Sequence, residues 1–207
     1  MSLLRYSELS AKLRRYDDAY RGYSQLFESA LIPQNKSTAV AGMMRTAFRD
    51  RKYSEALRSV ELVRGDSGTD GALRTEAAYI EAKSLLALSR RDEAMQAFKA
   101  LAAFPKTEYG AEASYILIQD CYDRGDFDAV EQMVYAFSDS GTSRQYWLAK
   151  SFIVLGDTFV EKGDLEQARA TFESVKDGYN PQKPDDVHDN VTMRLKKLAE
   201  LMSQPEQ

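Results

Sequence analysis

Apolar and small residues recur at helical spacing along most of the chain, and the pattern is clearest between Ser151 and Val175. Before a break at Gly163 and Asp164 the recurring positions are Phe152, Leu155, Gly156 and Phe159, and after the break they are Leu165, Ala168, Phe172 and Val175. This pattern predicts two amphipathic helices folded back on each other. Because one such pair cannot bury both apolar faces by itself, it requires similar neighbours.

The same pattern recurs upstream in the chain. The small-residue position of Ala168 falls on Val130, Ala94, Ala56 and Ala19, at intervals of 36 to 38 residues. The pattern predicts five helix–turn–helix units over residues 3–32, 36–65, 72–105, 106–141 and 142–179. Residues 185–202 add a capping helix with one apolar side, and with Arg194, Lys196 and Lys197 facing water. We therefore expect eleven helices, no strand and a single domain over residues 1–207.

The best unit resembles a known repeat. Aligned on Gly163, its residues resemble the tetratricopeptide repeat (TPR), with an aromatic residue, Leu-Gly, an aromatic residue, Gly-Asp, Ala, an aromatic residue and an apolar residue in that order. Gly156 and Ala168 would let the two helices approach closely, and Gly163 would supply the φ > 0 conformation that ends a helix. The resemblance implies an all-α fold in which the units stack as a solenoid, a right-handed α-α superhelix whose first helices line the inner curve. The family period is about 34 residues, so we expect longer second helices or loops here.

The composition favours neither catalysis nor nucleic-acid binding. The net charge of −4 contrasts with the basic face that nucleic-acid binding requires, and no apolar run is long enough to span a membrane. No phosphate-binding glycine loop or nucleophile elbow occurs, and Cys121 has no histidine near it in sequence. Asp185, His188 and Asp189 suggest a metal site, but they equally suit the acidic start of a helix. We predict no enzyme activity, no cofactor and no metal. A metal site at Asp185, His188 and Asp189 is the testable alternative hypothesis.

The resemblance also indicates which residues would bind a partner. In TPR proteins the fifth, ninth, twelfth and thirteenth positions of the first helix face the inner groove. The residues expected to bind a partner there are Arg45, Phe48, Arg49, Tyr79, Lys83, Tyr115, Gln119, Tyr122 and Asp157. Such a surface would be basic towards the N-terminus, aromatic in the middle and acidic towards the C-terminus. The Lys and Asn positions with which chaperone-binding members grip a terminal carboxylate are not matched, since Ala41 and Arg45 stand there.

Two functional hypotheses follow. The first is a non-enzymatic scaffold that binds an extended peptide or a helix of another protein in the groove. The alternative is a structural segment of a longer solenoid that mediates self-assembly. Residues 103–117 resemble the linkers of bacterial envelope repeat proteins, and residues 144–179 resemble repeats of Bacteroides-group proteins. These resemblances favour a bacterial origin and the periplasm or cell envelope over the cytoplasm. The oligomeric state is not predicted.

Overall fold

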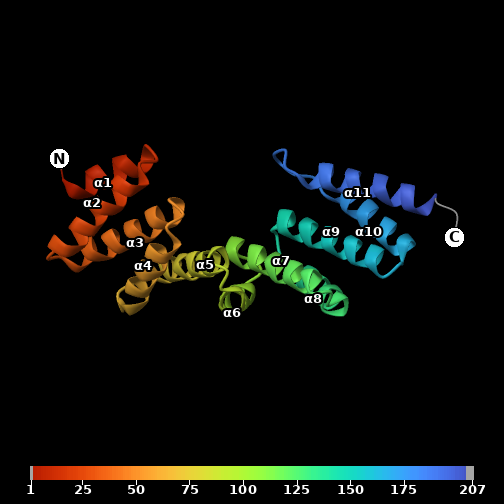
Figure 1. Cartoon of the computed structure of the whole chain (residues 1–207), viewed down its shortest axis with the longest axis horizontal. Helices are drawn as coiled ribbons and strands as arrows, with labels where there is room; N and C mark the ends of the chain where they lie inside the picture. The colour runs from red at the N-terminus through yellow and green to blue at the C-terminus, as the bar shows by residue number, and fades with distance from the viewer. Residues whose placement is uncertain (1, 204–207) are drawn as a thin grey trace. The chain divides into compact units, whose positions relative to one another are not determined.

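The computed structural model describes residues 2–203. Over that range the chain consists of helices joined by turns and loops (Figure 1). The helices are α1 (Leu3–Lys12), α2 (Tyr16–Ser29), α3 (Pro33–Arg49), α4 (Tyr53–Gly65), α5 (Gly71–Ala87), α6 (Arg91–Ala102), α7 (Glu108–Asp123), α8 (Phe127–Asp139), α9 (Gln145–Glu161), α10 (Leu165–Gly178) and α11 (Val187–Met202). The all-α class, with eleven helices and no strand among the described residues, is confirmed. No described helix is both long enough and apolar enough to cross a membrane.

The same tight turn joins two helices at five places. Its central residue has a left-handed φ of between 59° and 78°, and the five residues are Arg14, Arg51, Ser89, Gly125 and Gly163. At Gly163 the N–H donates to the carbonyl of Val160 at 3.0 Å, and the next N–H, of Asp164, donates to Phe159 at 2.9 Å. Each of the other four turns has the same two bonds, reaching back three and five residues. This is the Schellman arrangement, which satisfies carbonyls that the helix end would otherwise leave unpaired.

Buried positions keep a constant offset from these turns. Five residues after each left-handed residue lie Ala19, Ala56, Ala94, Val130 and Ala168, all 0% exposed. Nine residues after it lie the buried side chains of Tyr23, Val60, Phe98, Val134 and Phe172. A Cβ added at Gly156 would overlap the Phe172 ring. The absence of a side chain at Gly156 therefore makes room for the ring of Phe172, in addition to the close approach expected at Ala168.

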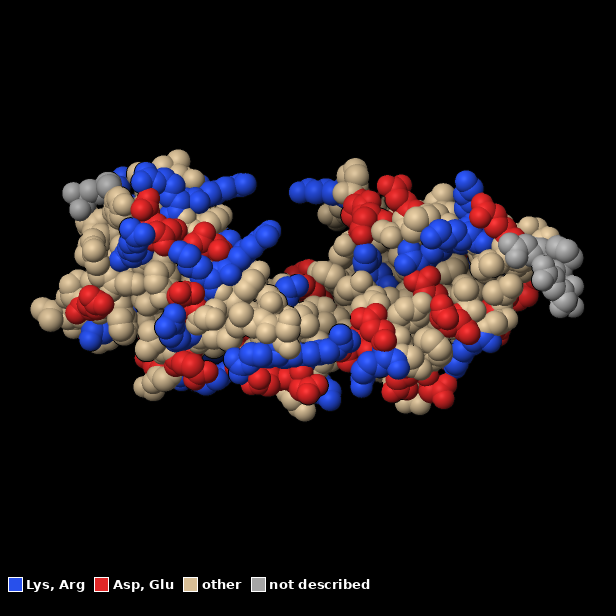
Figure 2. All heavy atoms as spheres, in the orientation of Figure 1, with Lys and Arg blue, Asp and Glu red and all other residues tan. Residues whose placement is uncertain are grey.

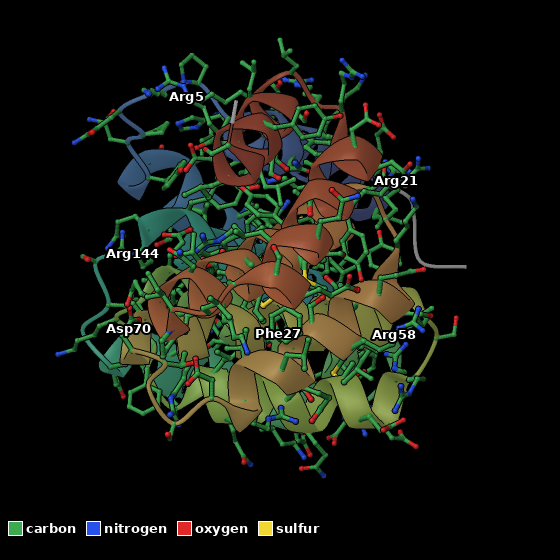
Figure 3. All side chains as sticks on the ribbon, turned by 90° about the vertical axis from the view of Figure 1, so that its left-hand side faces the viewer. Arg5, Arg21, Phe27, Arg58, Asp70 and Arg144 are labelled. Atoms are coloured by element: carbon green, nitrogen blue, oxygen red, sulfur yellow. The ribbon has the colours of Figure 1, made fainter. Side chains whose placement is uncertain are left out.

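The chain divides into two compact units, Met1–Ala97 and Phe98–Gln207, and the boundary falls within α6. In the first unit α2, α3, α4 and α5 pack in succession, and α3 also touches α5. Its core includes Met44 and Val60, and Phe27 packs against it from α2. Figure 3 shows Phe27 lying against the helices of this unit, whereas Arg21 and Arg58 point outward.

In the second unit α9 is the central helix, and it contacts α7, α8, α10 and α11. The core there includes Leu155, Phe172 and the buried residues Val187, Val191 and Leu198 of α11. The predicted apolar side of the last helix is therefore buried at those three positions. The prediction that Arg194 faces water was wrong, because its guanidinium is bound to Asp157 of α9. Helix α11 is held by polar contacts as well as by its apolar side.

Candidate functional site

Five of the residues predicted to bind a partner lie on α3 and α5 of the first unit, and we call this surface the α3–α5 face: Arg45, Phe48, Arg49, Tyr79 and Lys83. An ion pair joins its two helices. Arg45 donates from Nε and Nη2 to the two carboxylate oxygens of Glu76, at 2.7 and 2.5 Å. This two-point geometry is the one that a guanidinium offers to any carboxylate. The α3–α5 face therefore already contains one arginine–carboxylate pair.

The two aromatic residues of the α3–α5 face are half-buried. Phe48 meets Tyr53 edge-on with 6.1 Å between ring centroids, and Lys83 places its Nζ 5.8 Å from the centroid of the Tyr79 ring. Phe48 and Tyr79 pack against the same core cluster of the first unit. The core therefore holds each ring on one side, while the other side stays partly accessible. Aromatic residues at protein interfaces commonly have this arrangement.

Arg49 differs from its neighbours on this face. It is exposed and lies one helical turn after Arg45, so the two side chains share one side of α3. Within residues 2–203 it makes no hydrogen bond or ion pair. Arg49 therefore presents a guanidinium to solvent on the side of α3 that carries Arg45.

Three other predicted residues, Tyr115, Gln119 and Tyr122, lie on α7 in the second unit. The Tyr115 ring is 5.6 Å from that of Trp147 on α9, and Lys150 lies over it at 5.9 Å. Gln119 donates from its side-chain amide to Asp123 at 2.8 Å. All three side chains are half-buried. This side of α7 therefore presents two aromatic rings and one amide that are partly accessible.

Tyr122 lies in a negative environment. Burial raises the pKa of its phenol first, and the nearby carboxylates of Asp157 and Glu161 raise that pKa further. The ring packs against Phe127 with 5.9 Å between centroids. Asp157, the last of the nine predicted residues, is therefore close enough to Tyr122 to affect its titration.

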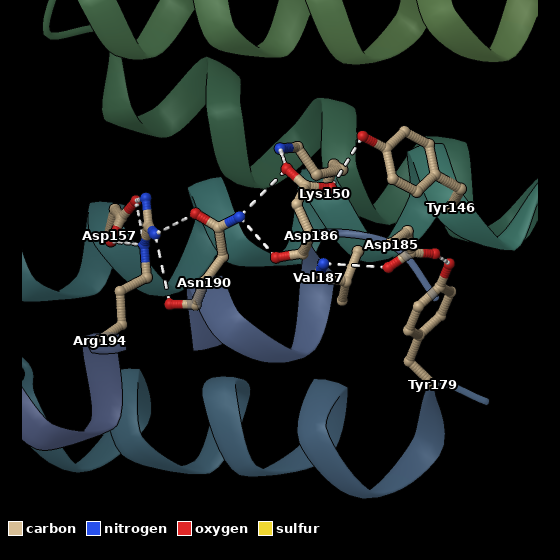
Figure 4. A network of polar contacts seen from close by, with 9 residues as sticks. All are labelled: Tyr146, Lys150, Asp157, Tyr179, Asp185, Asp186, Val187, Asn190 and Arg194. Carbon is tan, nitrogen blue, oxygen red and sulfur yellow. Dashed lines mark hydrogen bonds and ion pairs between the residues drawn. The ribbon is translucent and has the colours of Figure 1, made fainter. Parts of the chain in front are cut away.

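Asp157 is engaged by α11 (Figure 4). Arg194 donates to it from Nε at 2.7 Å and from Nη2 at 2.8 Å. Both side chains are about three-quarters covered, at 25% and 23% exposure. Of the nine predicted residues, Asp157 is thus the one whose carboxylate is used to hold the last helix.

A second anchor lies at the start of α11. Asp186 accepts from Tyr146 Oη at 2.9 Å and from Lys150 Nζ at 2.8 Å (Figure 4). The Lys150 ammonium is the main reason that the pKa of Asp186 lies below its usual value. Burial, followed by the bond to Asp186, raises the pKa of Tyr146 to about 12. Asp185 accepts from the N–H of Val187 at 3.0 Å and from the hydroxyl of Tyr179.

Sequence reasoning missed Lys150, Asp186 and Arg194 as members of this network. A signal for the Arg194 contact was present in the sequence. Asp157 and Arg194 stand 37 residues apart, and the left-handed turns recur at intervals of 36 to 38 residues. Residues one such interval apart lie on helices that are two apart in the chain, as Asp157 of α9 and Arg194 of α11 do. Opposite charges at this interval therefore predict an ion pair between those helices. No comparable signal exists for Asp186, which lies in the connection before α11.

The candidate groups for chemistry gain no support from the structure. Cys121 is buried, and its sulfur accepts from Arg124 Nη2 at 3.5 Å and lies 3.7 Å from the sulfur of Met133. His188 packs near the Tyr179 ring. Within the described range, no three His, Cys, Asp or Glu side chains are grouped as metal ligands. Asp185 and Asp186 instead serve the start of α11.

Charge differs between the two units. Residues 1–97 hold 16 Lys and Arg against 13 Asp and Glu, a net charge of +3, whereas residues 98–207 hold 12 against 19, a net charge of −7. Figure 2 shows acidic and basic side chains interspersed on the face in view. The two units therefore differ in net charge, but on the face in view each carries both acidic and basic side chains.

Neither the protein-family models nor the curated proteins compared with this chain match it.

Proposed function

We propose that this chain is a non-enzymatic scaffold of the TPR type that binds an extended peptide or a helix of another protein along its first helices. In this proposal α1 to α10 form five repeats of a right-handed superhelix, and α11 caps them. The five identical turns and the constant positions of the buried Ala, Val and aromatic residues support the repeat assignment.

One observation carries the binding proposal. At the predicted groove positions of α3, α5 and α7, aromatic and charged side chains remain exposed or half-buried, whereas positions facing the second helices are buried. Rings fixed by a core and flanked by charges provide contact area at little entropic cost. Within each compact unit, these are features of a binding surface that is formed before its partner arrives.

A peptide-display selection tests this proposal. The immobilised chain is expected to enrich a family of related 12-residue peptides from a random library. A variant carrying Ala at Arg45, Tyr79, Lys83, Tyr115 and Tyr122 should lose that enrichment while keeping the helical circular dichroism. A control variant carries Ala at Arg58, Lys99 and Tyr135, exposed residues of second helices, and it should enrich the same peptides. Equal enrichment by all three proteins would contradict the proposed surface.

The second candidate function is self-assembly, and the exposed apolar side of α1 favours it. Tyr6 and Leu9 of α1 are 36% and 47% exposed, and Leu13, which directly follows the helix, is 61% exposed. The equivalent positions of α3, such as Met43 and Thr46, are buried, and Met43 packs against Ala19 and Tyr23 of the preceding pair. Sedimentation velocity separates the two functions: self-assembly predicts a mass that rises with concentration and is reduced by Leu13→Asp.

The resemblance of residues 103–117 to envelope repeat linkers supports a setting in bacterial envelope assembly. In that linker Thr107 accepts from the N–H of Gly110 at 3.0 Å and donates to the carbonyl of Phe104 at 2.9 Å. A Cβ at Gly110 would overlap the backbone of Phe104. The Phe-Pro-x-Thr turn and the following Gly are therefore one structural unit, which makes the linker a defined motif for comparison.

A further inference from the structure

We infer that the α3–α5 face recognises acidic segments, so that the partner of the first unit is a peptide stretch combining carboxylates with an apolar or aromatic side chain. This inference rests on the proposed function and specifies the chemistry of the partner. It follows from three observations: a carboxylate already bound on the face, an arginine one helical turn further along α3 that pairs with no described group, and two half-buried rings on the same two helices.

The bound carboxylate belongs to Glu76. It accepts two hydrogen bonds from Arg45 although the Arg45 side chain is 47% exposed. The pair shows that a carboxylate can lie flat against this side of α3 and be held at two points. The geometry of recognition is thus present within the chain itself.

Arg49 extends that geometry by one helical turn. Four residues span about 6 Å along a helix, so the guanidinium of Arg49 can reach a carboxylate adjacent to the one that Arg45 holds. No described group pairs with Arg49. A guanidinium kept in this position binds an incoming carboxylate without first breaking an internal ion pair.

The rings define the apolar part of the ligand. Phe48 follows Arg45 by three residues and Tyr79 precedes Lys83 by four, so each ring shares a helix side with a basic group. Both rings pack against one core cluster. A peptide that places an apolar side chain on Phe48 or Tyr79 can bring a neighbouring carboxylate to Arg49.

The charge of the unit acts in the same direction. With a net charge of +3, residues 1–97 attract acidic segments during diffusional encounter, whereas residues 98–207, at −7, repel them. Such steering weakens as salt is added, since the screening length falls to about 8 Å at physiological ionic strength. Binding at the α3–α5 face is therefore expected to be tighter at low salt.

The test uses two fluorescein-labelled 12-residue peptides. Four positions are Glu in one peptide and Gln in the other, and both peptides carry the same Leu and Tyr residues between these four positions. Fluorescence anisotropy with the full chain in 50 mM salt is expected to show the Glu peptide binding about tenfold more tightly. Arg49→Gln should weaken that binding by about three- to tenfold. Arg58→Gln removes the same charge from the exposed side of α4 and should change it by less than about twofold.

Equal binding of the Glu and Gln peptides, or equal effects of Arg49→Gln and Arg58→Gln, would overturn the inference. Enrichment of peptides without acidic residues in the display selection would also overturn it while leaving the proposed function intact, whereas no enrichment at all would refute the proposed function itself. If the full chain self-associates and Arg49→Gln abolishes that association, the acidic occupant is a second copy and the assignment to a peptide of another protein fails.

Discussion

Arg194 and Asp157 form a two-point ion pair between helices α11 and α9, with three N–H···O contacts of 2.7 to 2.9 Å. Sequence reasoning had placed Arg194 in water and Asp157 in a groove open to a partner. The structure instead joins them, and with Asp186 they fix α11 along α9 at two points, one near the start and one in the middle of the helix (Figure 4). The last helix is therefore positioned by specific polar groups in addition to its buried valines and leucine.

Loss of this pair should loosen α11 without unfolding the rest of the second unit. Arg194→Gln leaves the largely covered carboxylate of Asp157 without its guanidinium partner. We expect a loss of about 1–2 kcal/mol, the usual effect of removing charge-assisted hydrogen bonds at a partly exposed site. Hydrogen exchange followed by mass spectrometry should show faster exchange in α11 than in α9 or α10.

Lys197→Gln is the matched control for Arg194→Gln, because it removes a positive charge from an exposed position of the same helix. Exchange in α11 should stay as in the wild type. Similar acceleration in both variants would mean that the overall charge of α11, and not the bond to Asp157, determines how firmly the helix is held.

The fold was largely predictable from the sequence because its signals are local. Helical periodicity and the recurring small residue placed nine of the eleven described helices within the expected ranges, whereas α3 begins before residue 36, at Pro33, and α5 begins before residue 72, at Gly71. At Gly125 and Gly163 the turn residue could also be identified from its type. At Arg14, Arg51 and Ser89 it could not, because residues other than glycine disfavour φ > 0. The position of the boundary between the two compact units was not predictable, because it lies within α6 and not at a loop.

The candidate site was less predictable because its state depends on which groups meet. The resemblance to TPR first helices identified Arg45, Phe48 and Tyr79 as candidate binding residues, but not that Glu76 would pair with Arg45. Similarly, Asp157 was placed on the correct helix without its partner on α11. Ion pairs between helices depend on the rotation of each helix and on side-chain reach, which sequence spacing determines only where the interval between units is regular.

Gly156 gives a test of helix packing. Gly156→Ala would place a Cβ within the space of the Phe172 ring, which is 1% exposed and has little room to move. Overpacking of this kind costs about 1–3 kcal/mol, more than the gain of about 1 kcal/mol that Ala brings to a helix, so the melting temperature should fall. Adding Phe172→Leu should recover part of the loss.

Gly178→Ala is the control for that substitution. Gly178 is the last residue of α10, and a Cβ there would meet nothing within 4 Å. Its melting temperature should equal or slightly exceed that of the wild type. If Gly156→Ala is equally harmless, the ring and the helix are not in the close contact described here.

The left-handed turns predict substitutions of opposite sign. Arg51 has a φ of 59°, and glycine adopts this conformation without steric cost, so Arg51→Gly should raise the free energy of unfolding by up to about 1 kcal/mol. Gly163 has a φ of 78°, and Gly163→Ala should lower it by about 1 kcal/mol. Urea denaturation measures both. Arg58→Gly, within α4, is the control and should be destabilising. A destabilising Arg51→Gly would indicate that the Arg51 side chain contributes to the turn.

Tyr146 should make the docking of α11 sensitive to alkaline pH. Burial and donation to Asp186 raise its pKa from 10 to about 12, so the folded state holds the phenol proton more tightly than the unfolded chain. The resulting stabilisation is complete below pH 10 and is lost as the pH rises to about 12.

Trp147 lies 4.8 Å from Tyr146, ring to ring, and is the single tryptophan, so its fluorescence reports on this site during urea unfolding. Lys150 also contacts Asp186, but it is present in every variant, and the difference between wild type and Tyr146→Phe isolates the phenol. Wild type should lose stability between pH 10 and 12 more steeply than Tyr146→Phe, whereas Tyr135→Phe, at an exposed position of α8, should follow the wild type. Parallel curves for wild type and Tyr146→Phe would show that the bond between Tyr146 and Asp186 does not hold α11 in solution.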